Sequence, residues 1–281
     1  MVENRPSQNI LSHIILILGV AIVSFPIYIA FVASTHEAKD VMSTVQGWFG
    51  TSLVENYSTV LKSSKGSAVG LPVAIMMWNS VIMSLGIVVG KISISILSAY
   101  AIVYFRFPLR MFFFWIIFMT LMLPVEVRIL PTFKVVADLG LLNSYSGLVL
   151  PLIASATATF LFRQFFLTVP DELVEAARVD GAGPVRFFLD ILLPLSRTNI
   201  AALFVILFIY GWNQYLWPLL ITTDKDMTTI VMGTAKMLTV MDEIPDWNVT
   251  MATAILALLP PLVVVVVMQR QFVRGLLETE K

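Results

Sequence analysis

Long uninterrupted apolar stretches recur along the whole chain. A helix needs about 20 residues to cross the roughly 30 Å hydrocarbon core of a bilayer. Six stretches have about this length, and they cover residues 10–33, 79–104, 111–123, 146–166, 200–221 and 251–268. The third is short, and we expect it to continue past Pro124. The pattern predicts an all-α, polytopic membrane protein with six transmembrane helices in a single domain over residues 1–281.

Composition supports the membrane assignment. Apolar residues make up 58% of the 281 residues and charged residues 13%, and the mean hydropathy is +0.88. Soluble domains are about 45–50% apolar and about 25% charged. The 18 basic residues are balanced by 18 acidic ones, so there is no cationic surplus for a nucleic-acid partner. The chain has no cysteine, which excludes disulfides and thiolate chemistry.

The first apolar stretch has two readings, a cleaved signal peptide or a retained helix. Small residues at Val32, Ala33 and Ser34 resemble a cleavage site. The stretch is longer than the 7–15 residues of a signal-peptide core, however, and only Arg5 makes its start basic. We therefore expect a retained first helix.

The distribution of basic residues predicts the orientation in the membrane. With the termini placed inside, ten Lys and Arg lie on the inner side and seven on the outer side, and Lys91 lies within a span. Every Arg except Arg128 is then on the inner side. Because basic residues are retained on the cytoplasmic side, both termini are predicted to be cytoplasmic. The outer segments are then residues 34–78, 124–145 and 222–250.

Residues 168–196, between the fourth and fifth spans, predict a cytoplasmic elbow of two short helices. Pro170 suits the first turn of the first helix. Gly181 suits a left-handed cap that ends it. Gly183 and Pro184 then open the second helix, and Pro194 is expected to end it.

The surface of this elbow suits contact with another protein. Ala176 and Ala177 leave a low surface that a partner backbone can approach, and Glu175, Arg178 and Asp180 surround it with charges that can fix the register. From the residues alone, an ordinary cytoplasmic loop with well-capped helices is the favoured interpretation, and a docking surface is the alternative.

The elbow resembles a known signature. Glu175-Ala176-Ala177, three residues, Gly181, nine residues and then Ile191-Leu192-Leu193-Pro194 is similar to the EAA motif of permease subunits of bacterial ABC importers that work with a binding protein. In that family the segment is the coupling helix that contacts the ATPase subunit. The resemblance therefore implies a coupling role for the elbow, with the residues Glu175, Ala176, Ala177, Asp180 and Gly181.

Other segments extend the resemblance to the carbohydrate importer subgroup. They are Asn79-Ser80, residues 98–101, residues 105–108 and residues 212–218. Residues 1–6, 121–128 and 271–275 are most similar to the second permeases of sn-glycerol-3-phosphate importers. This implies sn-glycerol-3-phosphate as the substrate, with glycerophosphodiesters as further candidates. The alternatives are a permease for a related sugar or maltooligosaccharide and a stand-alone secondary transporter.

The resemblance also implies the partners. They are a second permease subunit that forms a heterodimer with this chain, two ATPase subunits that bind ATP and Mg, and a substrate-binding protein outside the inner membrane. By analogy with the related maltose permease, the predicted outer segment 222–250 is expected to contact that binding protein. This chain is then expected to be non-catalytic and to hold no cofactor or metal of its own.

Lys91 is the one charge predicted to lie near the middle of a span. Such a charge is costly and usually faces a bundle interior or a watery path. It either attracts a phosphorylated substrate or bonds to polar groups and orients helices. The preceding glycines, Gly86 and Gly90, do not have P-loop spacing, because only three residues separate them and Ile92 follows the lysine. We expect them to form a close helix-packing face.

Polar residues also interrupt the aliphatic fifth span. Asn213, Gln214 and Tyr215 are candidates to line the pathway or to bond to the partner permease, because amide groups facing lipid would lack hydrogen-bond partners. No enzyme constellation competes with transport. The only histidines, His13 and His36, form no metal motif.

Overall fold

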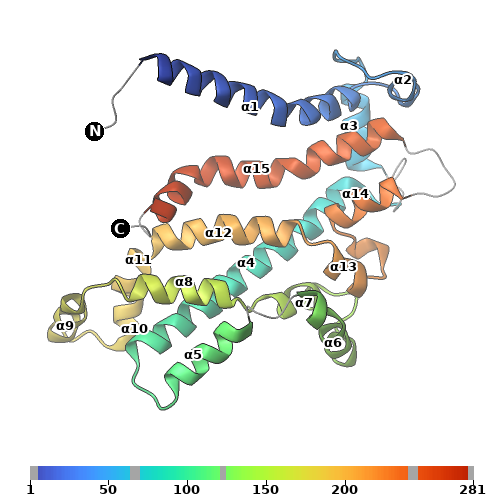
Figure 1. Ribbon diagram of the computed structural model, residues 1–281. Coiled ribbons are helices and arrows are strands. Elements are labelled where there is room, and N and C mark those ends of the chain that lie inside the picture. The colour runs from blue at the N-terminus through green and yellow to red at the C-terminus, as the bar shows by residue number, and fades with distance from the viewer. Residues whose placement is uncertain (1–5, 64–69, 121–124, 240–245, 278–281) are drawn as a thin grey trace. The chain divides into compact units, whose positions relative to one another are not determined.

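The computed structural model describes residues 6–63, 70–120, 125–239 and 246–277, and every regular element in these ranges is helical (Figure 1). The α-helices are α1 (Pro6–Ala33), α2 (Ala38–Ser43), α3 (Leu53–Lys62), α4 (Val73–Tyr104), α5 (Arg110–Met119), α6 (Val125–Asp138), α7 (Tyr145–Val149), α8 (Ala156–Phe166), α9 (Asp171–Val179), α10 (Pro184–Phe187), α11 (Leu193–Leu195), α12 (Arg197–Trp212), α13 (Leu216–Ile221), α14 (Ile230–Leu238) and α15 (Trp247–Leu277). Three short elements join them, namely the 3-10 turns η2 (Leu150–Leu152) and η4 (Lys225–Met227) and the π-helical turn η3 (Phe188–Leu192).

The described helices offer three to five candidate membrane spans. Three are long and apolar enough on their own: Ile10–Ala33, Val73–Tyr104 and Trp247–Arg270. Two further spans are broken pairs, Tyr145–Leu152 with Ala156–Phe166, bent by 48°, and Pro184–Leu195 with Arg197–Trp212, bent by 70°. The all-helical membrane fold is therefore as predicted, while the count of six stays a prediction.

Two of the predicted spans differ from the helices in the structure. The predicted span 200–221 is interrupted after Trp212, where α12 ends and α13 follows from Leu216. The predicted span 111–123 contains α5, which has ten residues and is too short to cross a bilayer by itself. Residues 121–123 of that span lie outside the described residues.

The chain divides into two compact units. The first unit is Met1–Met76 with Gly233–Leu259, and the second is Met77–Met232 with Pro260–Lys281. Long helices such as α4 and α15 contribute to both units.

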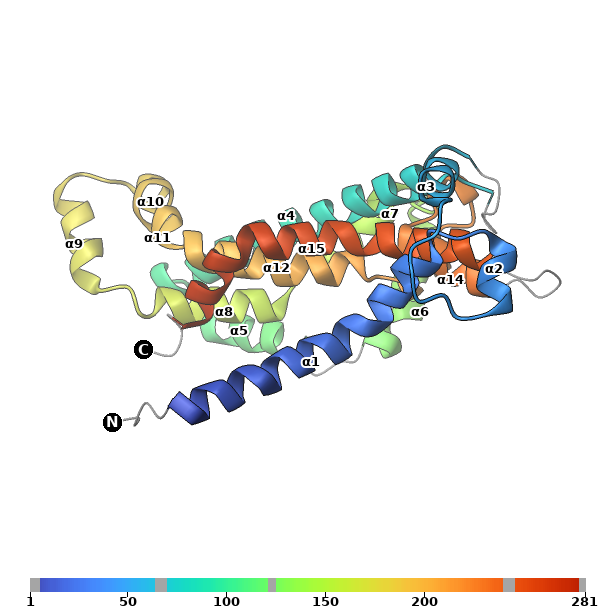
Figure 2. The ribbon, with the colours of Figure 1, turned by 90° about the horizontal axis from the view of Figure 1, so that it is seen from above.

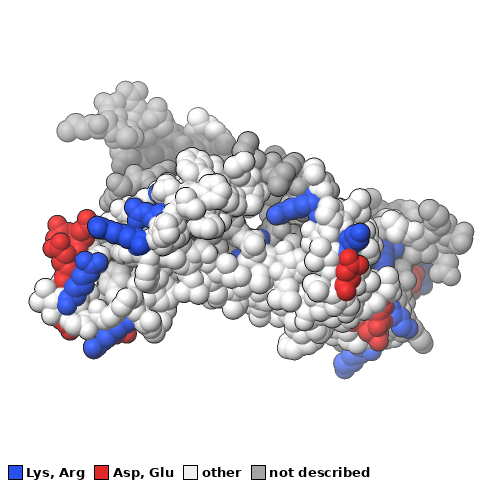
Figure 3. Space-filling model, turned by 90° about the horizontal axis from the view of Figure 1, so that it is seen from below, with Lys and Arg blue, Asp and Glu red and all other residues white. Residues whose placement is uncertain are grey.

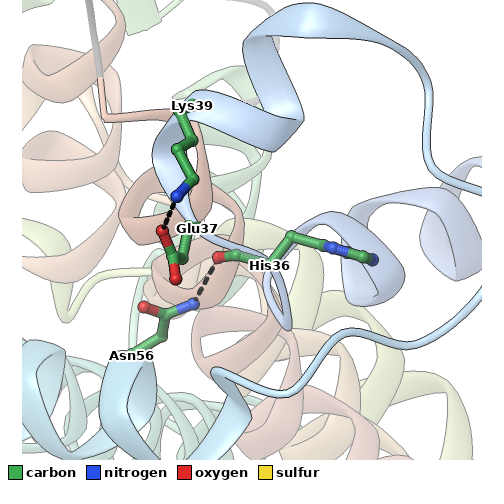
Figure 4. A network of polar contacts seen from close by, with 4 residues as sticks. All are labelled: His36, Glu37, Lys39 and Asn56. Atoms are coloured by element: carbon green, nitrogen blue, oxygen red, sulfur yellow. Dashed lines mark hydrogen bonds and ion pairs between the residues drawn. The ribbon is translucent and has the colours of Figure 1, made fainter.

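In the first unit, a buried amide network holds the segment that follows α1 (Figure 4). The Nδ2 group of Asn56 donates hydrogen bonds to the carbonyls of Ser34, at 2.9 Å, and His36, at 2.8 Å. Its Oδ1 accepts one from Nδ2 of Asn248 in α15, at 3.1 Å. The nearby ion pair between Lys39 and Glu37, at 2.8 Å, is exposed. The network fixes the turn from which α1 extends, and α1 itself presents its apolar side chains outward.

The core of the second unit joins α4, α6, α7 and α13. Its buried members are Met83, Ile87, Ile129, Val136, Leu148, Trp217 and Ile221. The indole N–H of Trp217 also donates to the carbonyl of Gly147, at 3.3 Å. Burying an aromatic side chain is most favourable when its polar atom keeps a partner. This core holds the short α7 and α13 in place beside the long α4.

Helix α4 packs closely on two of its neighbours. A Cβ atom at Gly86 would lie 2.9 Å from Cγ2 of Val149 in α7, and one at Gly211 of α12 would lie 3.0 Å from Cα of Ser84. Gly90 similarly faces Ile153. The predicted packing role of Gly86 and Gly90 is therefore confirmed.

The segment after α13 is attached to α4. The Nδ2 group of Asn79 donates to the carbonyls of Asp226 and Thr228, at 2.8 and 3.0 Å, while its Oδ1 accepts a 2.6 Å hydrogen bond from the hydroxyl of Tyr145. All three contacts lie within the second unit. At the other end of this unit, α9 and α10 extend beyond α8 and α12 (Figure 2).

Candidate functional site

The first elbow helix, α9, begins directly after Pro170. Pro170 has extended backbone angles, φ −60° and ψ 138°, and it precedes the first helical residue, Asp171. The prediction that Pro170 would lie inside the first turn was thus one residue off. Asp171 and Glu172 place negative charge at the positive end of the helix dipole, which favours a helix start here.

Gly181 ends α9 as the sequence predicted. Its φ is +74°, a left-handed conformation that glycine adopts without steric cost. The amide of Gly181 donates to the carbonyl of Arg178, at 3.0 Å, and the amide of Ala182 donates to the carbonyl of Ala177, at 2.8 Å. These two hydrogen bonds are those of a Schellman motif. The turn therefore depends on the backbone conformation at Gly181.

The second helical segment begins at Pro184, after Gly183, as predicted. It passes through the π-helical turn η3 into α11 and ends at Ser196, where the chain bends by 70° into α12. Pro194 lies within α11 and does not end the segment, contrary to the prediction. The π-helical turn η3 directly before it accommodates Pro194, because the regular hydrogen-bond pattern that a proline interrupts is already altered there.

The exposed face of the elbow carries most of the predicted coupling residues. Glu175, Ala176, Asp180 and Gly181 are exposed, whereas only 4% of Ala177 is accessible. The charges of this region are visible at the elbow end of the face in Figure 3, beside a broad uncharged surface. Of the two adjacent alanines, only Ala176 is therefore available to a partner.

Ala177 faces the end of α4. Together with Tyr100, Tyr104 and Phe187 it lines a pocket of about 270 Å³ between α4 and the elbow. The hydroxyl of Tyr100 donates to the carbonyl of Pro184, at 2.8 Å, and that of Tyr104 donates to the carbonyl of Phe166 in α8, at 3.3 Å. The end of α4 is thus bonded to both segments that flank α9.

The predicted pathway residue Lys91 is buried in the second unit. Only 7% of the residue is accessible, and its Nζ lies 3.7 Å from the centre of the Tyr210 ring in α12. A cation over an aromatic face is a favourable contact, and more so away from water. Gln214 joins the same region, since its Nε2 donates to the carbonyl of Tyr210, at 3.1 Å.

The other two predicted pathway residues are not brought to this cluster. Asn213 is exposed, and 40% of Tyr215 is accessible. The sequence reasoning did not select Tyr210 or Arg128 as site residues. Arg128, in α6, is close enough to interact electrostatically with both Lys91 and Tyr210. The available signal was that Arg128 is the only Arg in the predicted outer segments.

Comparison with known proteins identifies relatives over the whole chain. The family described as "Binding-protein-dependent transport system inner membrane component" matches residues 91–278. Proteins named sn-glycerol-3-phosphate transport system permease protein UgpE from Brucella melitensis, Rhizobium meliloti and Salmonella typhi are 60%, 61% and 59% identical to the chain over 282 aligned residues. Each alignment covers 100% of both sequences.

A solved structure has the same fold. It belongs to a bacterial ABC transporter involved in the import of the acidic polysaccharide alginate, and it superimposes with a TM-score of 0.81 over 97% of this chain and 99% of the other. The identity of 22% supports a shared fold and nothing about the substrate. The elbow motif, the membrane helices and the full-length similarity agree, and the chain belongs to the family of binding-protein-dependent transport system inner membrane components.

Proposed function

We propose that the chain is one permease subunit of an ATP-driven importer that carries sn-glycerol-3-phosphate, with glycerophosphodiesters as related cargo, across the inner membrane. The observation that supports this most directly is the identity of 59–61% with permeases named for that transport system, from end to end of both sequences. The alignments cover the whole chain, and they therefore include the segments that hold the elbow and the pathway cluster.

We further propose that residues 168–196 are the coupling elbow that receives the movement of an ATPase subunit. Glu175, Ala176 and Asp180 would form the contact, because they are exposed on one short helix. Ala177 and Gly181 would act indirectly. Ala177 packs the helix against the end of α4, and Gly181 sets the turn that directs it.

The bonds of the elbow suggest how its movement reaches the membrane. A displacement of α9 would act on α4 through Tyr100 and Pro184, and on the end of α8 through Tyr104 and Phe166. Packed helices move as rigid bodies more easily than they deform. The transport cycle would then consist of rigid helix movements around a midplane path.

The proposed complex contains a second permease, two ATPase subunits and a substrate-binding protein. ATP and Mg would be bound by the ATPase subunits and not by this chain. The concentration of Arg in the predicted inner segments supports cytoplasmic termini. A reporter fused to the C-terminus should therefore be active if it works in the cytoplasm, as green fluorescent protein does, and inactive if it requires export, as alkaline phosphatase does.

The proposed pathway passes Lys91 and Gln214. Asn213 and Tyr215, which are exposed in this chain, would contact the partner permease or line the path in the assembled complex. The outer segment 222–250 would contact the binding protein. Its described part is attached to α4 through Asn79, so a loaded binding protein could act directly on a membrane helix.

Uptake by the reconstituted importer tests the proposal. Proteoliposomes containing all subunits should accumulate labelled sn-glycerol-3-phosphate only when ATP is supplied on the ATPase side and the binding protein is supplied on the other. A complex with an ATPase subunit unable to hydrolyse ATP is the control. Uptake of maltooligosaccharide but not of sn-glycerol-3-phosphate would assign the chain to a sugar importer, and uptake without any ATPase would indicate a secondary transporter.

A further inference from the structure

Lys91 is a buried cation without a carboxylate partner in the described part of the chain. The ion pairs there are Lys39 with Glu37 and Arg186 with Asp190, and both are exposed. The Lys91 ammonium contacts the ring of Tyr210, whose centre lies 3.7 Å from Nζ. A charge inside a membrane domain is costly and normally finds a partner of opposite sign. A ring face compensates only part of the lost hydration.

A second cation adds to this cost instead of reducing it. Arg128 of α6 interacts electrostatically with both Lys91 and Tyr210. The Lys91 ammonium is buried, whereas the Arg128 side chain is exposed on this chain, and the two positive charges repel. An anion that contacts both cations would stabilise this arrangement. Without an anion, the repulsion between the two cations lowers the stability of the fold.

The cluster lies well inside the membrane domain. Lys91 lies 13 residues before Tyr104, where α4 ends. Tyr210 lies 13 residues after Arg197, where α12 begins. Both helix ends adjoin the elbow, so each residue is roughly 20 Å from it at 1.5 Å per residue. The distance from the elbow is thus the same along both helices. It places the cluster beyond the middle of a roughly 30 Å hydrocarbon core, on the side away from the elbow.

We propose that Lys91, Arg128 and the hydroxyl of Tyr210 form a binding site for a phosphomonoester on its way through this subunit. The proposal rests on the proposed function, since it takes the phosphate group to be that of the cargo. A phosphomonoester carries about −1.5 to −2 charges at pH 7, which matches two cations. Arg offers a planar fork of donors to phosphate oxygens, and Lys offers a mobile point charge.

Tyr210 has two roles in this site. Its ring holds the ammonium of Lys91 between transport events, and its hydroxyl is a donor for a phosphate oxygen. Gln214 bonds the backbone carbonyl of Tyr210 and thereby steadies the end of α12. Because the ring contact remains when the anion leaves, the Lys91 ammonium keeps a partner after release, and a transport path requires such reversible binding.

Uptake by charge variants tests the site. The complete importer with Lys91→Met should take up sn-glycerol-3-phosphate about tenfold more slowly at subsaturating substrate, since the loss of one charged contact changes an equilibrium by roughly this factor. Arg128→Gln should have a similar effect, and Lys91→Arg should keep most of the uptake. ATPase stimulation by the loaded binding protein should persist in all three, because the elbow is unchanged.

Ser95→Ala is the matched control on the same helix. The Ser95 hydroxyl is buried and donates to the carbonyl of Ser155, at 3.2 Å, outside the cluster. Its replacement removes a polar helix contact without removing charge and should leave uptake near that of the unmodified complex. Uptake by assembled Lys91→Met at more than half the normal rate would overturn the proposal. If Lys91→Met does not assemble, the decision rests on Arg128→Gln, whose side chain is exposed, and normal uptake by that variant would overturn the site.

A binding measurement separates this site from the proposed function. If the unmodified importer carries a neutral sugar, the proposed substrate is wrong, yet inorganic phosphate should still bind saturably to the purified complex and not to the Lys91→Met complex, as followed by phosphorus NMR. Absence of phosphate binding would overturn the site itself. Uptake that requires phosphatidylglycerol in the vesicles, and loses that requirement in Lys91→Met, would assign the cations to a lipid headgroup and also overturn the proposal.

Discussion

The hydroxyl of Tyr100, one turn before the end of α4, donates a 2.8 Å hydrogen bond to the carbonyl of Pro184, the first residue of α10. Tyr100 is 9% accessible, and the centre of its ring lies 5.0 Å from the centre of the Phe188 ring. One side chain thus connects a membrane-spanning helix to the elbow proposed to contact the ATPase. The contact suggests that transport and ATP hydrolysis are coupled through this end of α4.

Tyr100→Phe should lower the amount of substrate carried per ATP hydrolysed. The change removes the hydrogen bond but keeps the ring, and a lost bond of this kind costs about 1 kcal/mol. Tyr28→Phe is the matched control, because the Tyr28 hydroxyl donates a bond of the same length to the carbonyl of Gly47. Parallel assays of uptake and ATPase activity check the prediction. Equal effects of the two variants on the transport ratio would contradict it.

Gly181→Ala should weaken coupling through the backbone alone. A Cβ atom there would meet nothing within 4 Å, but φ is +74°, where an L-residue pays about 1–2 kcal/mol. Gly183→Ala is the control on the same elbow, because its Cβ is also free and its φ is −72°. We expect Gly181→Ala, and not Gly183→Ala, to reduce co-purification of the ATPase subunit and uptake. The opposite order would refute the assignment of the turn.

Gly86→Ala should destabilise the second unit. The new Cβ would lie 2.9 Å from Cγ2 and 3.0 Å from Cγ1 of Val149, whose branched side chain has few alternative rotamers. Overpacking of this kind costs about 1–3 kcal/mol. Thermal unfolding of the purified complex measures the loss. Val149→Ala in the Gly86→Ala background should restore much of it, and Gly19→Ala, with nothing within 4 Å, should change little. Failure of the double variant to recover would place the strain elsewhere.

Asn56→Leu should destabilise the first unit far more than Lys39→Ala. The leucine leaves the buried carbonyl of Ser34 and the carbonyl of His36 without their amide donor, and each unsatisfied group costs about 1–3 kcal/mol. Lys39 only contacts Glu37 at the surface, where its hydrogen bond lowers the pKa of the Glu37 carboxyl. Exposed ion pairs add little stability. The midpoint of thermal unfolding should therefore fall clearly for Asn56→Leu only, and a similar fall for both variants would count against the network.

Local sequence determined most of the fold class and the form of the elbow. The length of an apolar run predicts a membrane helix. A proline after an extended residue starts a helix and a glycine with positive φ ends one, and both effects are confined to about one helical turn. The stretches 10–33 and 79–104 and the cap at Gly181 were therefore predictable. The end of the elbow was not, because the π-helical turn that accommodates Pro194 is a backbone detail without a distinctive residue pattern.

Orientation and assembly of side chains were decided by tertiary contacts. The sequence presents Ala176 and Ala177 as equivalent, and only the position of α4 buries the second of them. The sequence likewise identified Lys91 as unusual by its charge in an apolar run, yet Tyr210 and Arg128 come from helices far along the chain. Hydrophobic length and turn chemistry are local properties, so the sequence alone predicted where the long apolar helices lie and how the first elbow helix ends. Which faces meet depends on packing between distant segments, so only the folded structure brings a buried lysine, an aromatic ring and an arginine together.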